Sequence, residues 1–454
     1  MAHHPQVAVI GAGASGLSAA ISAAEQGARV VLLEKGPRVG KRLLRTGNGR
    51  CNLSNTAIGP GLREGIYHNQ PFAAALLSRW DCAALRAWFD ERGLLTCADE
   101  RGWVYPRTRM ANSVLDVLRN RLSALGVETR VDWPFAHLEA DSDGFRLQNA
   151  RGERLCARTV ILAHGGEALA TLRHTEMRPV LGPLHTETAP IKGLDGIRVS
   201  VRLTLISDDS SVRDTRDMRD TCDMRDACDT RDTCTSFSEV GELLFRDFGI
   251  SGIVAFNLSR HARVGDQLAI DFFPEYDLET LTALLRRRGE LLGPLTERSY
   301  FDGLVHPRIG QLLAATATAT TTATTTAATA ATSAAAAATT TTSSTFVSAS
   351  DPQPQALAGA LKDWRLRMVG GPRPEQAQVT RGGYAVEDFD PHSLQSCAQP
   401  GLYAAGECLD VDGPCGGFNL HWAWVSGIVA GRAAATTASA TATTSASAAT
   451  PSHR

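Results

Sequence analysis

A glycine-rich turn near the N-terminus constrains the fold of this chain more than any other feature. The apolar run VAVIG at 7–11 leads into GAGASG at 11–16, and helix-compatible Ala and Leu spacing follows. A second apolar run, RVVLLE, ends at Glu34. In such a unit the glycines permit a tight turn, approach of backbone to a pyrophosphate and close helix packing, while the acid binds a ribose. The sequence therefore predicts a Rossmann-like α/β domain that binds a dinucleotide.

A distant segment bears on which dinucleotide binds, because the fingerprint alone does not separate NAD from FAD. The stretch GLYAAGECLDVDGPCGGFNLHWAWVSG at 401–427 combines a strand, an acid, paired glycines and a helix start at Phe418. Backbone N–H groups at a helix N-terminus can stabilise negative charge on a reduced flavin ring, which favours FAD. The apolar runs at 159–163 and 401–405 indicate further strands of one parallel sheet, so other units are expected between its pieces.

The middle of the chain has a different pattern. Residues 199–206 alternate as a half-buried antiparallel strand does, and residues 278–288 have helical periodicity. Three tracts lack the apolar variety that offsets ordering entropy: an Arg-Asp repeat at 213–234 and Ala/Thr-rich stretches at 314–345 and 433–450. We expect disorder or loosely formed helix there. The equal spacing of Cys222, Cys228 and Cys234 is what an expanded short repeat produces, so no metal site is predicted.

Composition excludes several classes of protein. The net charge is −2 and the Lys and Arg residues are scattered, so no nucleic-acid partner is predicted. No apolar run of about 18 residues indicates a membrane span, and the segment before Val7 has no apolar core of a signal peptide. The ten cysteines are expected to be reduced thiols. A cytoplasmic protein with a small-molecule substrate is the expectation, while the oligomeric state is left open.

Several short motifs in order resemble the BaiN/YhiN-type FAD-dependent oxidoreductases, which are aminoacetone-oxidase-like flavoproteins. They are GAGASG, GKRLLRTGNGRCNLSN at 40–55, EQAQVTRGG at 375–383 and the AAGECLDVDGPCGGFNLHWAW segment. The resemblance implies a glutathione-reductase-like FAD-binding domain split between 1–192 and 370–435. It also implies an inserted β-barrel-like domain at 193–255 and 346–369, which contains the 213–234 repeat, and a small helical domain at 256–313. The Ala/Thr tract at 314–345 and a disordered tail at 436–454 complete the predicted organisation.

The resemblance also implies which residues bind FAD. The pyrophosphate turn and ribose acid are Gly11, Gly13, Ala14, Ser15, Gly16 and Glu34. Lys35 and Arg42 lie along the nucleotide, and Ala163 and Gly165 are further cofactor-binding residues. The residues at the flavin are Asn48, Gly49, Arg50, Cys51, Asn52, Gly406, Glu407, Asp410, Gly417, Phe418 and Asn419. Phe135, in a strand region expected at 131–138, is implied as an adenine contact through its backbone.

The sequence departs from this family at two places. His164 replaces the threonine of an Ala-Thr-Gly-Gly motif, and the glycine-rich stretch that follows Gly166 is shortened before Pro190. His421 stands where relatives often have glutamine. The shortened stretch borders the cofactor in the family, and His421 lies just inside the helix that is expected to face the flavin.

Cys51 and His421 are the two weak candidates for catalysis. A dithiol flavoenzyme needs a second cysteine nearby, and no other cysteine shares the loop of Cys51, so a packing or flavin-edge role is preferred. Histidine suits proton transfer, but at the start of a helix it is often a hydrogen-bonded structural group. Arg381 could bind an anionic substrate, although an exposed arginine in a glycine turn is the commoner case.

The preferred function is an FAD-dependent oxidoreductase in which the flavin carries the chemistry. The resemblance suggests an NAD(P)H-dependent reductase of an activated C=C bond in an enone or steroid-like substrate. Because a single nucleotide fingerprint is present, NAD(P)H would be a transient donor. The alternatives are an FAD-dependent amine oxidase that uses oxygen and a non-catalytic flavin-binding or redox-responsive protein.

Overall fold

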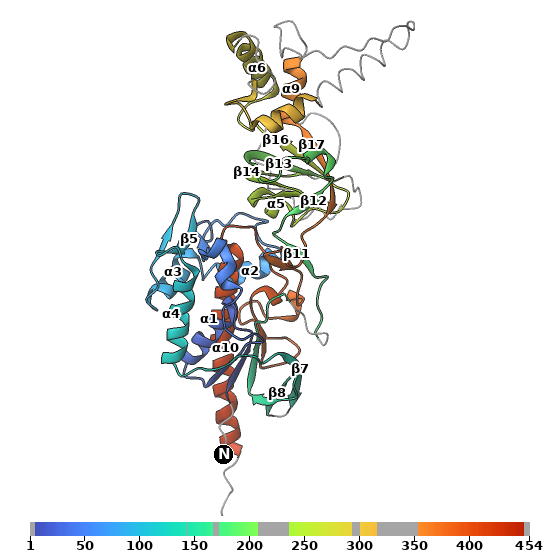
Figure 1. Cartoon of the computed structure of the whole chain (residues 1–454). Coiled ribbons are helices and arrows are strands. Elements are labelled where there is room, and N and C mark those ends of the chain that lie inside the picture. Colours follow the sequence, from blue (N-terminus) through green and yellow to red (C-terminus); the bar gives the residue numbers. More distant parts are fainter. Residues whose placement is uncertain are drawn as a thin grey trace, which may run out of the picture. The chain divides into compact units, whose positions relative to one another are not determined.

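The computed structural model describes residues 5–141, 143–166, 172–207, 236–292, 300–315 and 353–448. They form two compact units: the first contains the described residues up to Pro179 and from Gln378 onward, and the second contains those from Val180 to Ala377. Figure 1 shows the elements of each unit. The Arg-Asp repeat, its three cysteines and residues 316–345 of the Ala/Thr tract lie outside the described residues.

A parallel five-stranded sheet lies at the centre of the first unit, with its strands in the order β19–β10–β1–β2–β6. The bounds are Leu402–Ala404, Thr159–Leu162, Val7–Ile10, Val30–Leu33 and Glu128–Arg130. β1, β2, β10 and β19 are buried at every position, which explains their continuous apolar sequence. The pairing of β1 with β10, and of β10 with β19, confirms that distant segments complete one sheet.

Two helices of this unit pack against each other, α1 (Ala14–Glu25) and α10 (Phe418–Ala448), and they run side by side in Figure 1. A Cβ atom at Gly427 would lie 2.2 Å from the carbonyl oxygen of Ser15, and one at Gly431 would clash with α1 in the same way. The two helices therefore approach closely because these positions are glycines. This packing places both helix N-termini at the carboxyl ends of the strands that precede them.

The described part of the first unit also contains two small antiparallel sheets and three further α-helices, and strand β18 pairs with β11, whose last residue, Val180, begins the second unit. Their bounds are β3 Ser54–Asn55, β5 Trp103–Pro106 and β4 Thr96–Ala98; β7 Phe135–Asp141, β8 Gly144–Asn149 and β9 Arg154–Ala157; β11 Arg178–Val180 and β18 Val379–Arg381; α2 Gln70–Leu77, α3 Cys82–Asp90 and α4 Ala111–Ala124.

The second unit contains a closed antiparallel barrel in the order β12–β15–β14–β13–β16–β17. The bounds are Leu184–Thr186, Gly249–Ser251, Ser236–Arg246, Arg198–Ile206, Gln267–Asp271 and Trp364–Gly370. Residues Val201, Leu203 and Leu205 of β13 are buried, whereas their neighbours along the strand are not, which confirms the predicted alternation. The second unit also contains the helices α5 (Ile253–Leu258), α6 (Leu278–Leu292) and α9 (Gln353–Lys362). Leucines of α6 and α9 belong to the same hydrophobic core as the buried residues of the barrel strands.

The structure differs from the predicted boundaries at five places. Residues Gln267–Asp271, expected in the helical domain at 256–313, form the barrel strand β16. The barrel starts before residue 193, because β12 pairs with β15 and β17. Residues 353–362, expected in the β-rich domain, form α9. The tail expected to be disordered from 436 is helical to Ala448, since alanine has the highest helix propensity. The strand expected at 131–138 begins only at Phe135, and the N–H groups of Asp132 and Trp133 instead donate to Gly36 and Glu34.

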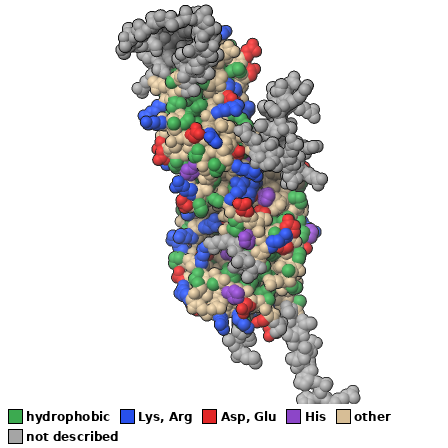
Figure 2. Space-filling view, turned by 90° about the vertical axis from the view of Figure 1, so that its right-hand side faces the viewer, with side chains coloured by type: hydrophobic (Ala, Val, Ile, Leu, Met, Phe, Trp, Pro, Cys, Tyr) green, Lys and Arg blue, Asp and Glu red, His purple; other side chains and the backbone are tan. Residues whose placement is uncertain are grey.

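Lys and Arg side chains lie among Asp and Glu side chains over the face that Figure 2 shows. Within the described parts of the chain, no helix has the length and apolar character needed to cross a membrane.

Candidate functional site

The turn between β1 and α1 has the three glycines in three different roles. Gly11 has a φ of +100°, and a Cβ atom there would lie 2.4 Å from the carbonyl oxygen of Ala163. A Cβ at Gly16 would lie 1.7 Å from the carbonyl oxygen of Gly11, whereas one at Gly13 would meet nothing within 4 Å. Gly13 precedes α1, which has neither a side-chain cap nor an acid in its first turn. The open N-terminus of α1 therefore suits a phosphate group.

Glu34 follows β2 and faces this turn. Its carboxylate accepts hydrogen bonds from the N–H groups of Ala12 at 3.0 Å and Gly36 at 2.8 Å. The carboxylate is therefore fixed at the carboxyl end of the sheet beside the glycine turn, where a dinucleotide fold binds its ribose. Lys35 is exposed beside it.

Three segments that are distant in sequence meet around Glu407. Arg42 Nη1 lies 3.3 Å from Glu407 Oε2, and the N–H of Thr380 donates to Glu407 Oε1 at 2.7 Å. A Cβ at Gly165 would lie 3.0 Å from Arg42 Nη1, and one at Gly166 would lie 2.2 Å from Thr380 Oγ1. The motifs at 40–55, 163–166, 375–383 and 401–427 thus converge at the carboxyl end of the central sheet.

The loop TGNGRCN consists largely of left-handed backbone. Gly47, Asn48, Gly49 and Cys51 have φ values of 54°, 53°, 81° and 57°. Residues 47–50 are exposed, but Cys51 is fully buried. Burial raises the pKa of the Cys51 thiol to about 12, against a smaller opposing effect of Thr46. The thiol is therefore protonated at neutral pH, and the exposed backbone beside it is the part of the loop that a ligand can reach.

The end of this loop lies against the start of α10. Gly417 has a φ of +98°, and a Cβ there would lie 2.2 Å from the carbonyl oxygen of Ser54. With its amide oxygen facing α10, Asn52 accepts from the N–H of Gly417 at 3.2 Å. The Asn419 side chain accepts from the N–H of Gly413 at 2.8 Å and donates to its carbonyl at 2.7 Å. These contacts fix the turn that precedes α10, while Phe418 is buried and Gly406 packs against Ser15.

His421 is an internal structural group rather than an accessible acid or base. Its side chain is fully buried, with Nδ1 2.7 Å from Ser54 Oγ and Nε2 2.9 Å from the carbonyl oxygen of Trp80. Because a carbonyl only accepts, Nε2 carries the hydrogen and Nδ1 accepts from the Ser54 hydroxyl. Burial lowers the His421 pKa from 6.5 to about 4, and the Trp80 carbonyl opposes this in part. The ring is neutral at neutral pH with both nitrogens bonded.

The side chains of Phe135 and Arg50 take no part in the contacts described above for the glycine turn, Glu34, Glu407 and the start of α10. Phe135 starts β7 and is paired with Asn149, half-buried, although the preceding residues 132–133 bond to the Glu34–Gly36 segment. Arg50 and Asn48 are exposed. Their contacts to a nucleotide stay predictions.

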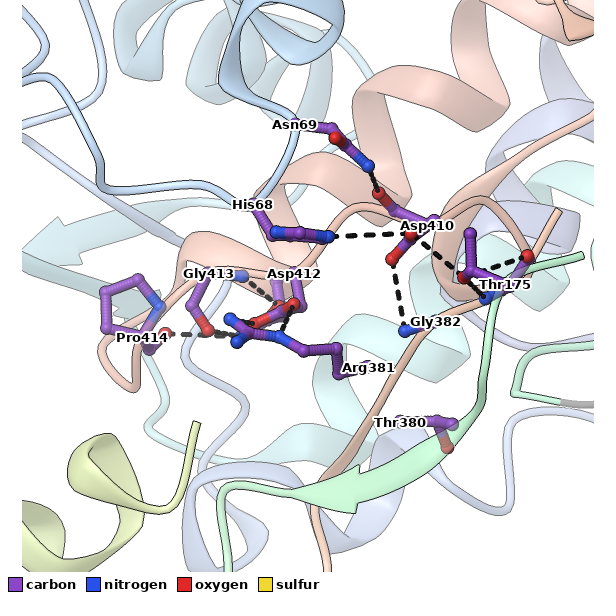
Figure 3. Close-up of polar contacts among 12 residues, drawn as sticks. His68, Asn69, Thr175, Thr380, Arg381, Gly382, Asp410, Asp412, Gly413 and Pro414 are labelled. Carbon is purple, nitrogen blue, oxygen red and sulfur yellow. Dashed lines mark hydrogen bonds and ion pairs between the residues drawn. The ribbon is translucent and has the colours of Figure 1, made fainter. Parts of the chain in front are cut away.

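A polar cluster around Asp410 was not predicted in this form. Asp410 Oδ2 lies 3.5 Å from His68 Nε2 and accepts from Thr175 Oγ1 at 2.9 Å, and Asp410 Oδ1 accepts from the N–H of Gly382 at 3.1 Å. Figure 3 shows these groups converging on the carboxylate. Burial raises the Asp410 pKa, but His68 and these hydrogen bonds together outweigh it and hold the pKa below its usual value.

Asp412 is a second buried carboxylate in the same segment, and it is paired with Arg381. Arg381 Nε lies 2.7 Å from Asp412 Oδ1, and Arg381 Nη2 lies 3.1 Å from Oδ2, a two-bond arrangement visible in Figure 3. The Asp412 side chain is 1% exposed and that of Arg381 16%. Arg381 is therefore a partly buried partner of the buried Asp412, not the exposed turn residue that was expected. The sequence signal for this pairing was the presence of two acids, Asp410 and Asp412, in the otherwise apolar stretch 409–413.

Among the residues with described positions, no group of three or more His, Cys, Asp or Glu side chains is arranged to hold a metal ion.

Comparison with known proteins matches residues 5–433 to the family described as HI0933-like protein Rossmann domain. The chain belongs to this family. Members of the HI0933-like family are FAD-dependent oxidoreductases, and so is this protein. The open helix N-terminus at Gly13 and the fixed carboxylate of Glu34 fit the pyrophosphate and ribose of FAD.

Three curated relatives of this HI0933-like protein match along almost their whole length. A protein of Clostridium scindens named 3-dehydro-bile acid delta(4,6)-reductase is 29% identical, with 95% of this chain and 99% of that protein covered. Proteins of Escherichia coli and Haemophilus influenzae, both named ribosomal RNA dihydrouridine synthase, are 25% and 23% identical. These matches cover 92% and 94% of this chain and 95% and 97% of the relatives.

Proposed function

We propose that this protein uses NAD(P)H to reduce a C=C bond that is conjugated to a carbonyl group. The observation that supports it best is the full-length similarity to a protein named as a delta(4,6)-reductase of a 3-dehydro-bile acid. The names of the other two relatives point to the same chemistry, since dihydrouridine is uridine with a reduced ring C=C next to a carbonyl. An enone, which includes steroid-like ketones, is therefore the proposed substrate class.

FAD is proposed to bind along the carboxyl end of the central sheet. The pyrophosphate takes the turn at Gly11–Gly16 and the N-terminus of α1, and the ribose takes Glu34. The flavin ring takes the exposed TGNGRCN backbone and the turn at Gly417 before α10. The N–H groups that begin α10 favour negative charge, which suits a ring that accepts electrons. Arg42, Gly165, Glu407 and Asn419 support this path through the contacts described above.

NAD(P)H is proposed as a transient electron donor. The chain has a single glycine fingerprint, which FAD occupies, so the nicotinamide nucleotide would bind, reduce the flavin and leave. FAD supplies the hydride chemistry, while the protein holds the substrate and excludes competing reactions.

The proposal is tested by incubating the FAD-loaded protein with NADH or NADPH and a conjugated steroid enone, with its saturated ketone as the control. We expect nucleotide oxidation that depends on the enone, and a product two hydrogen masses heavier by mass spectrometry. Uridine-containing ribosomal RNA is the second substrate to test, because of the names of two relatives. Peroxide formation from small amines, with no enone reduction, would instead indicate the amine oxidase.

A further inference from the structure

A partly exposed histidine faces a buried, oriented carboxylate in the first unit. The His68 side chain is 38% exposed, whereas that of Asp410 is only 6% exposed, and His68 Nε2 lies 3.5 Å from Asp410 Oδ2. Thr175 and Gly382 donate to the same carboxylate, one to each oxygen. Figure 3 shows the His68 ring directed edge-on toward this carboxylate. A histidine whose ring is held in place by a carboxylate in this way is suited to transfer a proton to or from a substrate.

The carboxylate is suited to orient the ring because it is ionised and cannot rotate freely. The Asp410 pKa is below its usual value despite burial, owing to His68 and to the donors Thr175 and Gly382. The ionised Asp410 pairs with Nε2 of His68 at 3.5 Å, which leaves Nδ1 as the ring nitrogen on the side away from that contact. A proton can therefore leave or enter the ring at Nδ1.

The backbone around His68 is fixed to the segment that leads into α10. The Tyr67 hydroxyl donates to the carbonyl of Phe418 at 2.9 Å, and the N–H of His68 donates to the carbonyl of Asp412 at 2.8 Å. The Asn69 side chain donates to the carbonyl of Asp410 at 2.7 Å. Three consecutive residues are thus bonded to 410–418, the segment that contains the turn at Gly417, which is proposed above to meet the flavin ring.

We propose that His68 donates the proton that completes reduction of the conjugated C=C bond, with Asp410 as its positioning residue. This inference rests on the proposed function. Reduction adds a hydride to the carbon that is β to the carbonyl and a proton to the α carbon, and the electron pair comes from NAD(P)H, which becomes NAD(P)⁺. His68 releases the proton from Nδ1 to the α carbon, the C=C π bond is replaced by two C–H bonds, and solvent returns a proton to the ring.

The test compares His68→Gln and His68→Ala with a matched control. His137→Gln has the same substitution at another histidine with a carboxylate partner, because His137 Nε2 lies 3.1 Å from Glu139 on β7. Two rates are measured anaerobically: reduction of the enzyme by NAD(P)H, and its reoxidation by the enone. General acids contribute about 10²–10⁴-fold, so reoxidation should slow by about 100-fold or more in both His68 variants, with the NAD(P)H step unchanged. Free imidazole should restore part of the rate to His68→Ala alone.

A second readout does not depend on turnover. Diethylpyrocarbonate modification of histidines is followed by mass spectrometry with and without a saturated ketone product bound. We expect the product to protect His68 and not His137. Equal reoxidation rates in wild type and His68→Gln, or modification of His68 that the product does not affect, would overturn the proton-donor role. Failure of the proposed function has a different signature, because the wild-type protein itself would then not be reoxidised by an enone.

Discussion

Replacement of His421 by glutamine tests whether this buried imidazole makes the first unit sensitive to acid. The ring is fully buried, accepts from the Ser54 hydroxyl and donates to the Trp80 carbonyl. A glutamine amide can accept at one end and donate at the other, so it can replace both bonds without a titratable group.

The size of the effect follows from the pKa of His421, which burial lowers from 6.5 to about 4. Since the folded state favours the neutral ring, this contribution to stability is complete above pH 6.5 and is lost as the pH falls toward about 4. At about 1.4 kcal/mol per pH unit the full loss is about 3 kcal/mol, of which about 2 kcal/mol falls between pH 7 and pH 5. The glutamine variant should lack this loss.

Urea unfolding at a series of pH values measures the difference. Tryptophan fluorescence follows the first unit, because six of the seven tryptophans lie in it and only Trp364 lies in the second. We expect the free energy of unfolding of the wild type to fall by about 2 kcal/mol more than that of His421→Gln between pH 7 and pH 5. Parallel pH dependences in the two proteins would refute the assignment of a neutral, buried imidazole.

The glycine turn, the Arg381–Asp412 pair and the buried Cys51 thiol each lend themselves to one direct comparison. Gly16→Ala should prevent folding because its Cβ would lie 1.7 Å from the carbonyl oxygen of Gly11. Gly13→Ala has room for its Cβ, so it should fold, as circular dichroism would show, but retain less FAD. Equal FAD content in Gly13→Ala and wild type would contradict the pyrophosphate site. Arg381→Ala should lower the free energy of unfolding in urea by about 3–5 kcal/mol because it removes the partner of buried Asp412. Arg381→Lys keeps the charge and should lower the free energy of unfolding less. Similar losses of stability in the two variants would show that the charge is unimportant. Iodoacetamide at about pH 8 should alkylate exposed Cys397 and not Cys51 in the native protein, as peptide mass spectrometry would show; comparable alkylation would mean that Cys51 is accessible.

The parts of this fold that can be predicted from sequence are those in which a short stretch of residues reflects its own surroundings. The turn at 11–16 is recognisable because two of its glycines are required by nearby backbone: Gly16 by the carbonyl oxygen of Gly11 in the same turn, and Gly11 by the carbonyl oxygen of Ala163, directly after β10. The buried strands are recognisable because each is covered on both faces and is therefore apolar throughout. Family resemblance then supplied the order of the inserted units.

The polar groups around α10 could not be predicted in the same way. Thr175 and Asp410 are 235 positions apart, and His68 lies on a third segment, so no spacing in the sequence joins them. The roles of Cys51 and His421 depend on burial, which one residue's neighbours in sequence do not determine. Arg381 has its partner 31 positions away and looks like a surface residue until Asp412 is seen beside it.

Anaerobic mixing of the NAD(P)H-reduced, FAD-loaded protein with a conjugated enone shows whether the reduced flavin passes its electrons to an activated C=C bond. We expect the yellow colour of oxidised FAD to return as one enone per flavin becomes the saturated ketone, and an alkene without a conjugated carbonyl to leave the protein colourless. The proposed reductase activity is wrong if neither nicotinamide nucleotide bleaches the protein, or if the bleached protein stays colourless with both the enone and uridine-containing RNA until oxygen is admitted.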